Sequence, residues 1–301
     1  MDIARLLFPD FSLIALGYLV CRFTPLDRGV WEPVERLVYY FLFPVLLFHS
    51  IVRTPLQLGP ASSLIGAGLL LGLAGIAMAY AIPHLPGLRR HVDRREHAAA
   101  AQVAFRFNSF IALAMAGRLG GDAGLQLVAV LIGVCVPIMN VGAVWPMARH
   151  AQTGVVAALV RNPLIVATVG GLIANLAGLR IPALLEPIVA RLGSSSLALG
   201  LMAAGAGLQL GSLARSRTLS AAVLGIRHLL MPLVAFGLVL LFRLDPLQAT
   251  VLLVFSALPT SSSGYVLASR MGYNGSYVAG LVTLSTVLGV LSLTAVLGLS
   301  R

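Results

Sequence analysis

Two short polar clusters interrupt long apolar stretches of this sequence. The first, AFRFNSFIALAM (104–115), carries Arg106, Asn108 and Ser109. The second, VFSALPTSSSGYVLA (254–268), carries Pro259, Thr260, Ser261, Ser262 and Ser263. A guanidinium, an amide and several hydroxyls are groups that bind carboxylates, and a proline breaks a helix because it lacks a backbone donor. Together these residues are the candidate binding residues of the chain.

The two clusters are in register, because Asn108 and Pro259 lie 151 positions apart. If both segments are broken helices, their half-helix N-termini direct positive dipole ends at one place and favour an anion. Other readings stay open. The proline and serines also occur in ordinary membrane helices, where small residues allow close packing, and Asn108 alone could join two helices by a hydrogen bond.

Arg106 lies nine residues into its apolar run, about 14 Å along a helix. That depth is close to the middle of a bilayer, where a charged side chain is costly and faces a cavity or a partner. Two roles are open for Arg106. It is either the counter-charge of a bound anion or a cap for the carbonyl groups of a broken helix.

The elements that must position these residues are membrane helices. The 301 residues are 58% hydrophobic and only 10% charged, and the mean hydropathy is +0.95. These values predict an all-α, multi-pass integral membrane protein. Ten spans of suitable length are expected, at 5–22, 34–52, 62–82, 97–117, 123–147, 160–178, 188–209, 218–242, 247–269 and 275–299.

The basic residues predict the orientation. All 21 are Arg, and most lie in short loops between apolar runs. With both termini outside, inside loops hold eleven of them and outside segments six, which agrees with the positive-inside rule. We therefore expect both termini outside and no nucleic-acid partner. The expected location is a bacterial inner membrane.

An internal repeat divides the chain. Residues 16–33 resemble residues 170–187, with Glu32-Pro33 matching Glu186-Pro187. Ten spans divide into five plus five, and an odd number per half inverts the second half in the membrane. We therefore expect two inverted repeats, 1–150 and 151–301, with crossed and broken fourth and ninth spans, as in many secondary transporters.

Several other chemistries are not expected. The acidic residues lie at span ends or in loops, so no carboxylate pair is expected at the crossing. Cys21 and Cys135 form no CxxC motif, and neither a metal site nor a cofactor is expected. Ser261–Ser263 lack a GxSxG-like context and His228 lies in another span, which disfavours an intramembrane enzyme. A non-transporting receptor would be expected to carry a soluble domain.

Several segments resemble the auxin efflux carrier family, which includes plant PIN-type carriers and bacterial permeases annotated for malate or malonate. These segments are FSLIALGYLV, VERLVYYFLFPVLLFHSI, RNPLIVATVGGLIANLAGLRIP, SSLALGLMAAGAGL and ALPTSSSGYVLASRMGYNGSYVAGLVTLSTVLGVLSL.

The resemblance implies a scaffold of helices 1, 2, 6 and 7. It also implies a mobile transport domain of helices 3–5 and 8–10 that works by an elevator movement. The family's crossover Asn and Pro map onto Asn108 and Pro259. The fourth span departs from many relatives because no Pro follows Asn108.

The function expected from all this is secondary transport of small organic anions such as carboxylates. The alternative is a transporter similar to bile acid/sodium symporters. A small-molecule substrate and the lipid bilayer are the expected partners. The coupling ion, a proton or sodium, and a homodimer are left open.

Overall fold

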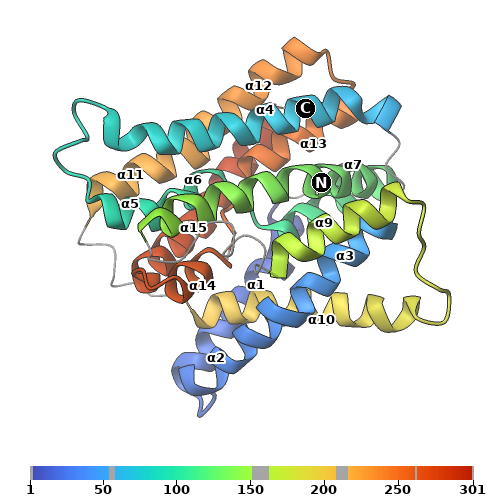
Figure 1. The fold of residues 1–301 in the computed structure, drawn as a ribbon, viewed down its shortest axis with the longest axis horizontal. Coiled ribbons are helices and arrows are strands. Elements are labelled where there is room, and N and C mark those ends of the chain that lie inside the picture. Colours follow the sequence, from blue (N-terminus) through green and yellow to red (C-terminus); the bar gives the residue numbers. More distant parts are fainter. Residues whose placement is uncertain (1–2, 54–57, 151–162, 208–215, 262, 300–301) are drawn as a thin grey trace.

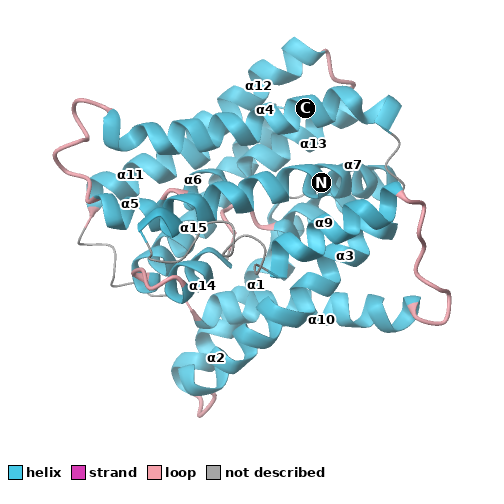
Figure 2. Cartoon of the chain, viewed as in Figure 1, coloured by secondary structure: helices cyan, strands magenta, loops and turns pink. Residues whose placement is uncertain are grey.

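The computed structural model of the chain describes every residue except 1–2, 54–57, 151–162, 208–215, 262 and 300–301. Among the described residues every regular element is a helix, and Figure 2 shows no strand there. The first-half helices are α1 (Ile3–Phe23), α2 (Arg28–Leu37), η1 (Val38–Leu42), α3 (Phe43–Arg53), α4 (Leu58–Ala81), η2 (Ile82–His84), α5 (Arg94–Ala100), α6 (Gln102–Phe105) and α7 (Ser109–His150). The second-half helices are α9 (Pro163–Leu176), α10 (Glu186–Ala206), α11 (Arg217–Gly225), η4 (Ile226–Leu230), α12 (Met231–Phe242), α13 (Pro246–Ala257), α14 (Ser263–Arg270) and α15 (Gly275–Leu299).

Long apolar helices dominate the described part of the chain. Five helical segments there are long and apolar enough to cross a membrane. They are Arg28–Arg53, Ser62–His84, Leu127–Ala148, Arg217–Phe242 and Gly275–Gly298. The all-helical, membrane-spanning class expected from composition is therefore confirmed.

The second expected span begins earlier than its hydropathy suggested. The helix starts at Arg28 rather than near residue 34, because the carboxylate of Asp27 accepts the backbone N–H of Gly29 and caps it. The extra turns are polar, with two glutamates and two arginines in the segment RGVWEPVERL. A search for apolar residues does not find such an amphipathic extension.

Two prolines explain two π-helical turns. The turn η1 ends two residues before Pro44, and η4 ends two residues before Pro232. Proline offers no N–H to the preceding turn and its ring clashes with that turn's carbonyl, so the helix widens locally. Such widenings occur often at functional sites, and η4 contains Arg227.

One group of helices packs around α10. Helix α1 lies along α10, and α3 lies against both α9 and α10. The backbones of α1 and α10 touch, because a Cβ added at Gly205 would overlap the carbonyl oxygen of Ile14. Asn175 of α9 donates to the carbonyl oxygen of Ile51 of α3 at 2.6 Å. In Figure 1, α1, α2 and α10 lie toward the bottom of the view.

The remaining helices form a second group. Helix α4 packs against α7 and α12, α13 packs against α7 and α12, and α14 packs against α15. In Figure 1, α4, α11 and α12 lie toward the top of the view, opposite α10. The two polar clusters of the sequence belong to this second group.

Candidate functional site

Both polar clusters interrupt helices. Helix α6 ends at Phe105, and Arg106 is extended, with φ −71° and ψ 153°, before α7 begins at Ser109. Helix α13 ends at Ala257, and Leu258 is extended, with φ −57° and ψ 147°, before α14 begins at Ser263. The breaks expected in the fourth and ninth spans therefore lie at the expected residues.

The two breaks contact each other directly. The backbone N–H of Asn108 donates to the carbonyl oxygen of Pro259 at 2.9 Å. We call this junction, residues 106–108 and 258–261, the crossing. Both Asn108 and Thr260 are almost completely buried, with 4% and 2% of their surface exposed. Segments half a chain apart therefore meet where the register of the sequence predicted.

Side chains satisfy the backbone groups that the breaks leave free. The Asn108 Oδ1 atom accepts the N–H of Ile111 at 3.2 Å and caps the start of α7. The N–H of Thr260 donates to the Ser285 hydroxyl at 2.9 Å. Ser292 donates to the carbonyl oxygen of Ala257 at 2.8 Å. Buried backbone groups need such partners, which explains why α15 supplies two serines here.

Arg106 spans both broken helices. Its Nη1 donates to Gln102 Oε1 at 2.8 Å, and its Nη2 donates to the Ser263 hydroxyl at 2.9 Å. The amide of Gln102 continues the link by donating to the carbonyl oxygen of Gly264 at 3.1 Å. The Ser261 and Ser263 hydroxyls lie 2.8 Å apart. The arginine therefore ties the end of α6 to the start of α14.

The charge of Arg106 meets only neutral hydrogen-bond partners among the described residues. It is 6% exposed, and no carboxylate of the described chain lies within ion-pair distance of it. A buried cation without a countercharge attracts an anion strongly. The α7 and α14 N-termini begin beside it, so their dipole ends add to the same positive potential.

The other candidate residues are placed as follows. Ser109 is the first residue of α7 and is 8% exposed. Ser262 lies outside the described residues. The structure therefore brings Asn108 against Pro259, next to Thr260 in the chain, and links Arg106, Ser263 and Ser261 through hydrogen bonds.

The sequence reasoning missed Arg227. This side chain is completely buried, in η4, and binds carbonyl oxygens of both broken helices. Its Nε donates to Leu258 at 2.7 Å, its Nη2 to Phe255 at 3.2 Å, and its Nη1 to Phe105 at 3.5 Å. Its depth in the sequence could have identified it as a candidate. Arg227 lies nine residues into its expected span, as Arg106 does.

His228, next along η4, completes the support of the crossing. Its Nδ1 lies 3.0 Å from the Ser292 hydroxyl and its Nε2 lies 2.9 Å from the Ser285 hydroxyl. Ser292 donates its proton to the carbonyl oxygen of Ala257, so the hydrogen of the contact between Nδ1 and Ser292 lies on Nδ1.

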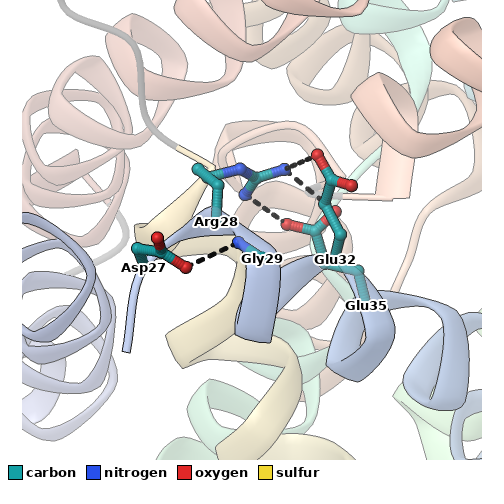
Figure 3. A network of polar contacts seen from close by, with 5 residues as sticks. All are labelled: Asp27, Arg28, Gly29, Glu32 and Glu35. Atoms are coloured by element: carbon teal, nitrogen blue, oxygen red, sulfur yellow. Dashed lines mark hydrogen bonds and ion pairs between the residues drawn. The ribbon is translucent and has the colours of Figure 1, made fainter. Parts of the chain in front are cut away.

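A polar cavity of about 670 Å³ lies between the two groups of helices, lined by residues of α2, α14 and α15. Its wall includes Arg28, Glu32, Glu35, Tyr265 and Arg270. Figure 3 shows Arg28 held between the two glutamates, 2.6 Å from Glu35 and 4.0 Å from Glu32. Tyr265 belongs to α14, whose first residue, Ser263, contacts Arg106. The cavity therefore reaches the half-helix that leads to the crossing.

Comparison with known proteins supports the same class. Over 310 aligned residues the chain is 22% identical to the "Putative malonate transporter" of Rhizobium meliloti (strain 1021), and the alignment covers 100% of this chain and 96% of that protein. This name indicates a transporter rather than an enzyme, and the name of the matching family does the same. The family model described as membrane transport protein matches residues 76–297, and the chain therefore belongs to this membrane transport family, the auxin efflux carrier group that its segments resemble.

Proposed function

We propose that this protein is a secondary transporter of small organic anions that binds its substrate at the crossing. The observation that carries the proposal is the buried charge of Arg106, which has only neutral partners among the described residues. A carboxylate would supply the missing countercharge and accept hydrogen bonds from the guanidinium. Asn108, Ser109, Pro259, Thr260 and Ser261–Ser263 would shape the rest of the site.

The first substrate to test is malonate. The relative from Rhizobium meliloti carries that substrate in its printed name. A short dicarboxylate suits this crossing, because one carboxylate would approach Arg106 while the other approached a half-helix N-terminus, at Ser109 or Ser263. A monocarboxylate would use only one of these two features, and we expect it to bind more weakly.

We further propose alternating access by an elevator movement. Helices α1–α3, α9 and α10 would form the scaffold, and α4–α7 with α11–α15 would move. The packing of the helices into two groups supports this division, and so does the polar cavity between the groups. Ten spans in two inverted repeats, both termini outside and an inner-membrane location belong to the same proposal.

Uptake of radiolabelled malonate into proteoliposomes tests the function. We expect wild-type uptake, and a fall of at least about tenfold in Arg106→Gln, because a charge-assisted hydrogen bond contributes about 1.5–3 kcal/mol. Arg217→Gln is the matched control, since Arg217 is exposed, and should transport like wild type. Full uptake by a folded Arg106→Gln protein would remove Arg106 from the site.

The same vesicles test the alternative reading. A transporter of the bile acid/sodium symporter type would lose uptake when choline replaces sodium outside. A proton-coupled carrier would instead respond to an imposed pH gradient. Uptake that follows neither gradient would indicate a uniporter or an exchanger.

A further inference from the structure

Backbone carbonyl groups from the ends of both broken helices converge on one side chain, that of Arg227. The last four carbonyl groups of a helix have no partner within it, and they carry the negative end of its dipole. Helix α6 ends at Phe105 and α13 ends at Ala257, and carbonyl groups of both ends lie within hydrogen-bond reach of Arg227. In membrane transporters, carbonyl groups of this kind, from unwound segments and half-helix ends, coordinate the coupling cation.

In this chain the guanidinium of Arg227 takes those carbonyl groups. It reaches Leu258 and Phe255 from the ninth-span break and Phe105 from the fourth-span break. The side chain is 0% exposed, and no carboxylate of the described chain pairs with it. Its charge is therefore balanced by carbonyl dipoles, as the charge of a bound metal cation would be.

We propose that Arg227 is a tethered cation that replaces a sodium ion at the crossing. A guanidinium stays protonated at any pH that the protein meets, and its fork of donors suits several carbonyl oxygens at once. The positive charge that other carriers must bind from solution is then part of the polypeptide. As a consequence, transport needs no sodium ion at this place.

The two buried arginines have different tasks under this proposal. Arg227 binds the C-terminal ends of α6 and α13, whereas Arg106 lies beside the N-terminal ends of α7 and α14. Arg227 therefore holds the C-terminal ends together, whereas Arg106, which hydrogen-bonds only the neutral groups of Gln102 and Ser263, keeps an unbalanced charge that attracts the substrate. The expectation of sodium-independent transport rests on the proposed function. The binding of a cation by the carbonyl groups does not, because it is measurable in the purified protein.

The test is chemical rescue of the Arg227→Ala variant in detergent. Its melting temperature (Tm) is the readout. The variant leaves the carbonyl groups without their cation. We expect 20 mM guanidinium chloride to raise its Tm by about 2 °C or more over choline chloride at equal ionic strength. Wild type and Arg217→Ala, the control within the same helical span Arg217–Phe242, should not respond. Stabilisation by sodium chloride in the variant alone would also support a vacated cation site.

An equal response of all three proteins to guanidinium and to sodium would overturn the proposal. If Arg227→Ala does not fold, Arg227→Lys keeps a cation at the carbonyl groups and is expected to fold and transport. A folded Arg227→Met protein with wild-type Tm and uptake would overturn it, since that side chain carries no charge.

Wild-type uptake supplies a second readout. We expect malonate uptake to change less than twofold when choline replaces sodium at constant pH. A loss of tenfold or more would show that sodium is still required and would overturn the transport consequence. Absence of uptake of any acid would count against the proposed function instead, and the Tm measurements would still decide the role of Arg227.

Discussion

The backbone N–H of Asn108 donates to the carbonyl oxygen of Pro259 at 2.9 Å, which joins the two broken helices of the chain at one point. Neither residue could make this bond in an unbroken helix, because their N–H and carbonyl groups would be used within their own turns. Asn108 also caps α7 through its side chain. Asn108 therefore has a structural task that is independent of any substrate. A useful mutation must separate this capping from substrate binding.

Asn108→Ala and Asn108→Ser separate them. The alanine variant loses the cap and should be destabilised by about 1 kcal/mol. The serine variant retains a capping oxygen and should keep a Tm close to wild type. If the Asn108 amide also binds substrate, the serine variant will still show a raised KM for malonate. Proteoliposome kinetics and thermal unfolding of both variants check this, and a serine variant with wild-type KM would reduce Asn108 to a cap.

Gly289 gives a second test, because it holds α15 against the break. A Cβ added there would lie 2.9 Å from Cδ and 3.0 Å from Cβ of Pro259, so the ring would have to shift. Gly289→Ala should therefore displace Pro259 and reduce uptake several-fold. Gly298→Ala is the matched control on the same helix, since its added Cβ would meet nothing within 4 Å. Equal uptake by the two variants would show that the position of Pro259 is not critical.

Gly205 tests the packing of the proposed scaffold. Its backbone touches the backbone of α1, so Gly205→Ala must push the two helices apart. We expect destabilisation of about 1–3 kcal/mol, the usual range for overpacking. Gly170→Ala in α9 meets nothing within 4 Å and should be neutral or slightly stabilising. Thermal unfolding of both variants measures the difference in stability. If the Gly205→Ala protein is as stable as the Gly170→Ala protein, α1 and α10 separate readily.

The breaks were predictable because their causes are local. Pro259 removes a donor wherever it stands, and Asn108 favours a cap, so each marks its own interruption. Pro259 and Asn108 also lie 151 positions apart, close to the offset of the predicted repeat, and this spacing led us to expect that they would meet. The start of α2 also has a local cause, but the prediction placed it several residues too far along the chain. Asp27 caps a first turn that is polar, and the prediction followed apolar residues.

Arg227 was not predictable as a partner of the crossing, although its depth in an apolar run was visible. Its carbonyl partners Phe105 and Leu258 lie 122 and 31 positions away, and carbonyl groups leave no mark in a sequence. Arg106 and Arg227 look alike in the sequence. Only the structure shows that one faces helix N-termini and the other C-terminal ends.

The contact between Arg270 and Tyr40 provides the test of the elevator movement. Arg270 ends α14 and donates to the Tyr40 hydroxyl of η1, and its guanidinium lies 4.2 Å from the centre of the Tyr40 ring. The two residues belong to the proposed mobile and fixed groups, so their contact must break when the groups move. It should therefore stabilise the state in which the polar cavity is open.

Labelling of the cavity measures that stabilisation. Ser269 lines the cavity and is exposed, so a Ser269→Cys substitution in a Cys21→Ser, Cys135→Ala background reports access to a maleimide. Arg270→Gln removes an exposed cation–π contact of about 0.5–1 kcal/mol and should slow labelling about two- to fivefold. Tyr40→Phe keeps the ring and should have a smaller effect, and Arg217→Gln none. Labelling at the wild-type rate in Arg270→Gln would show that this contact does not bias the two states.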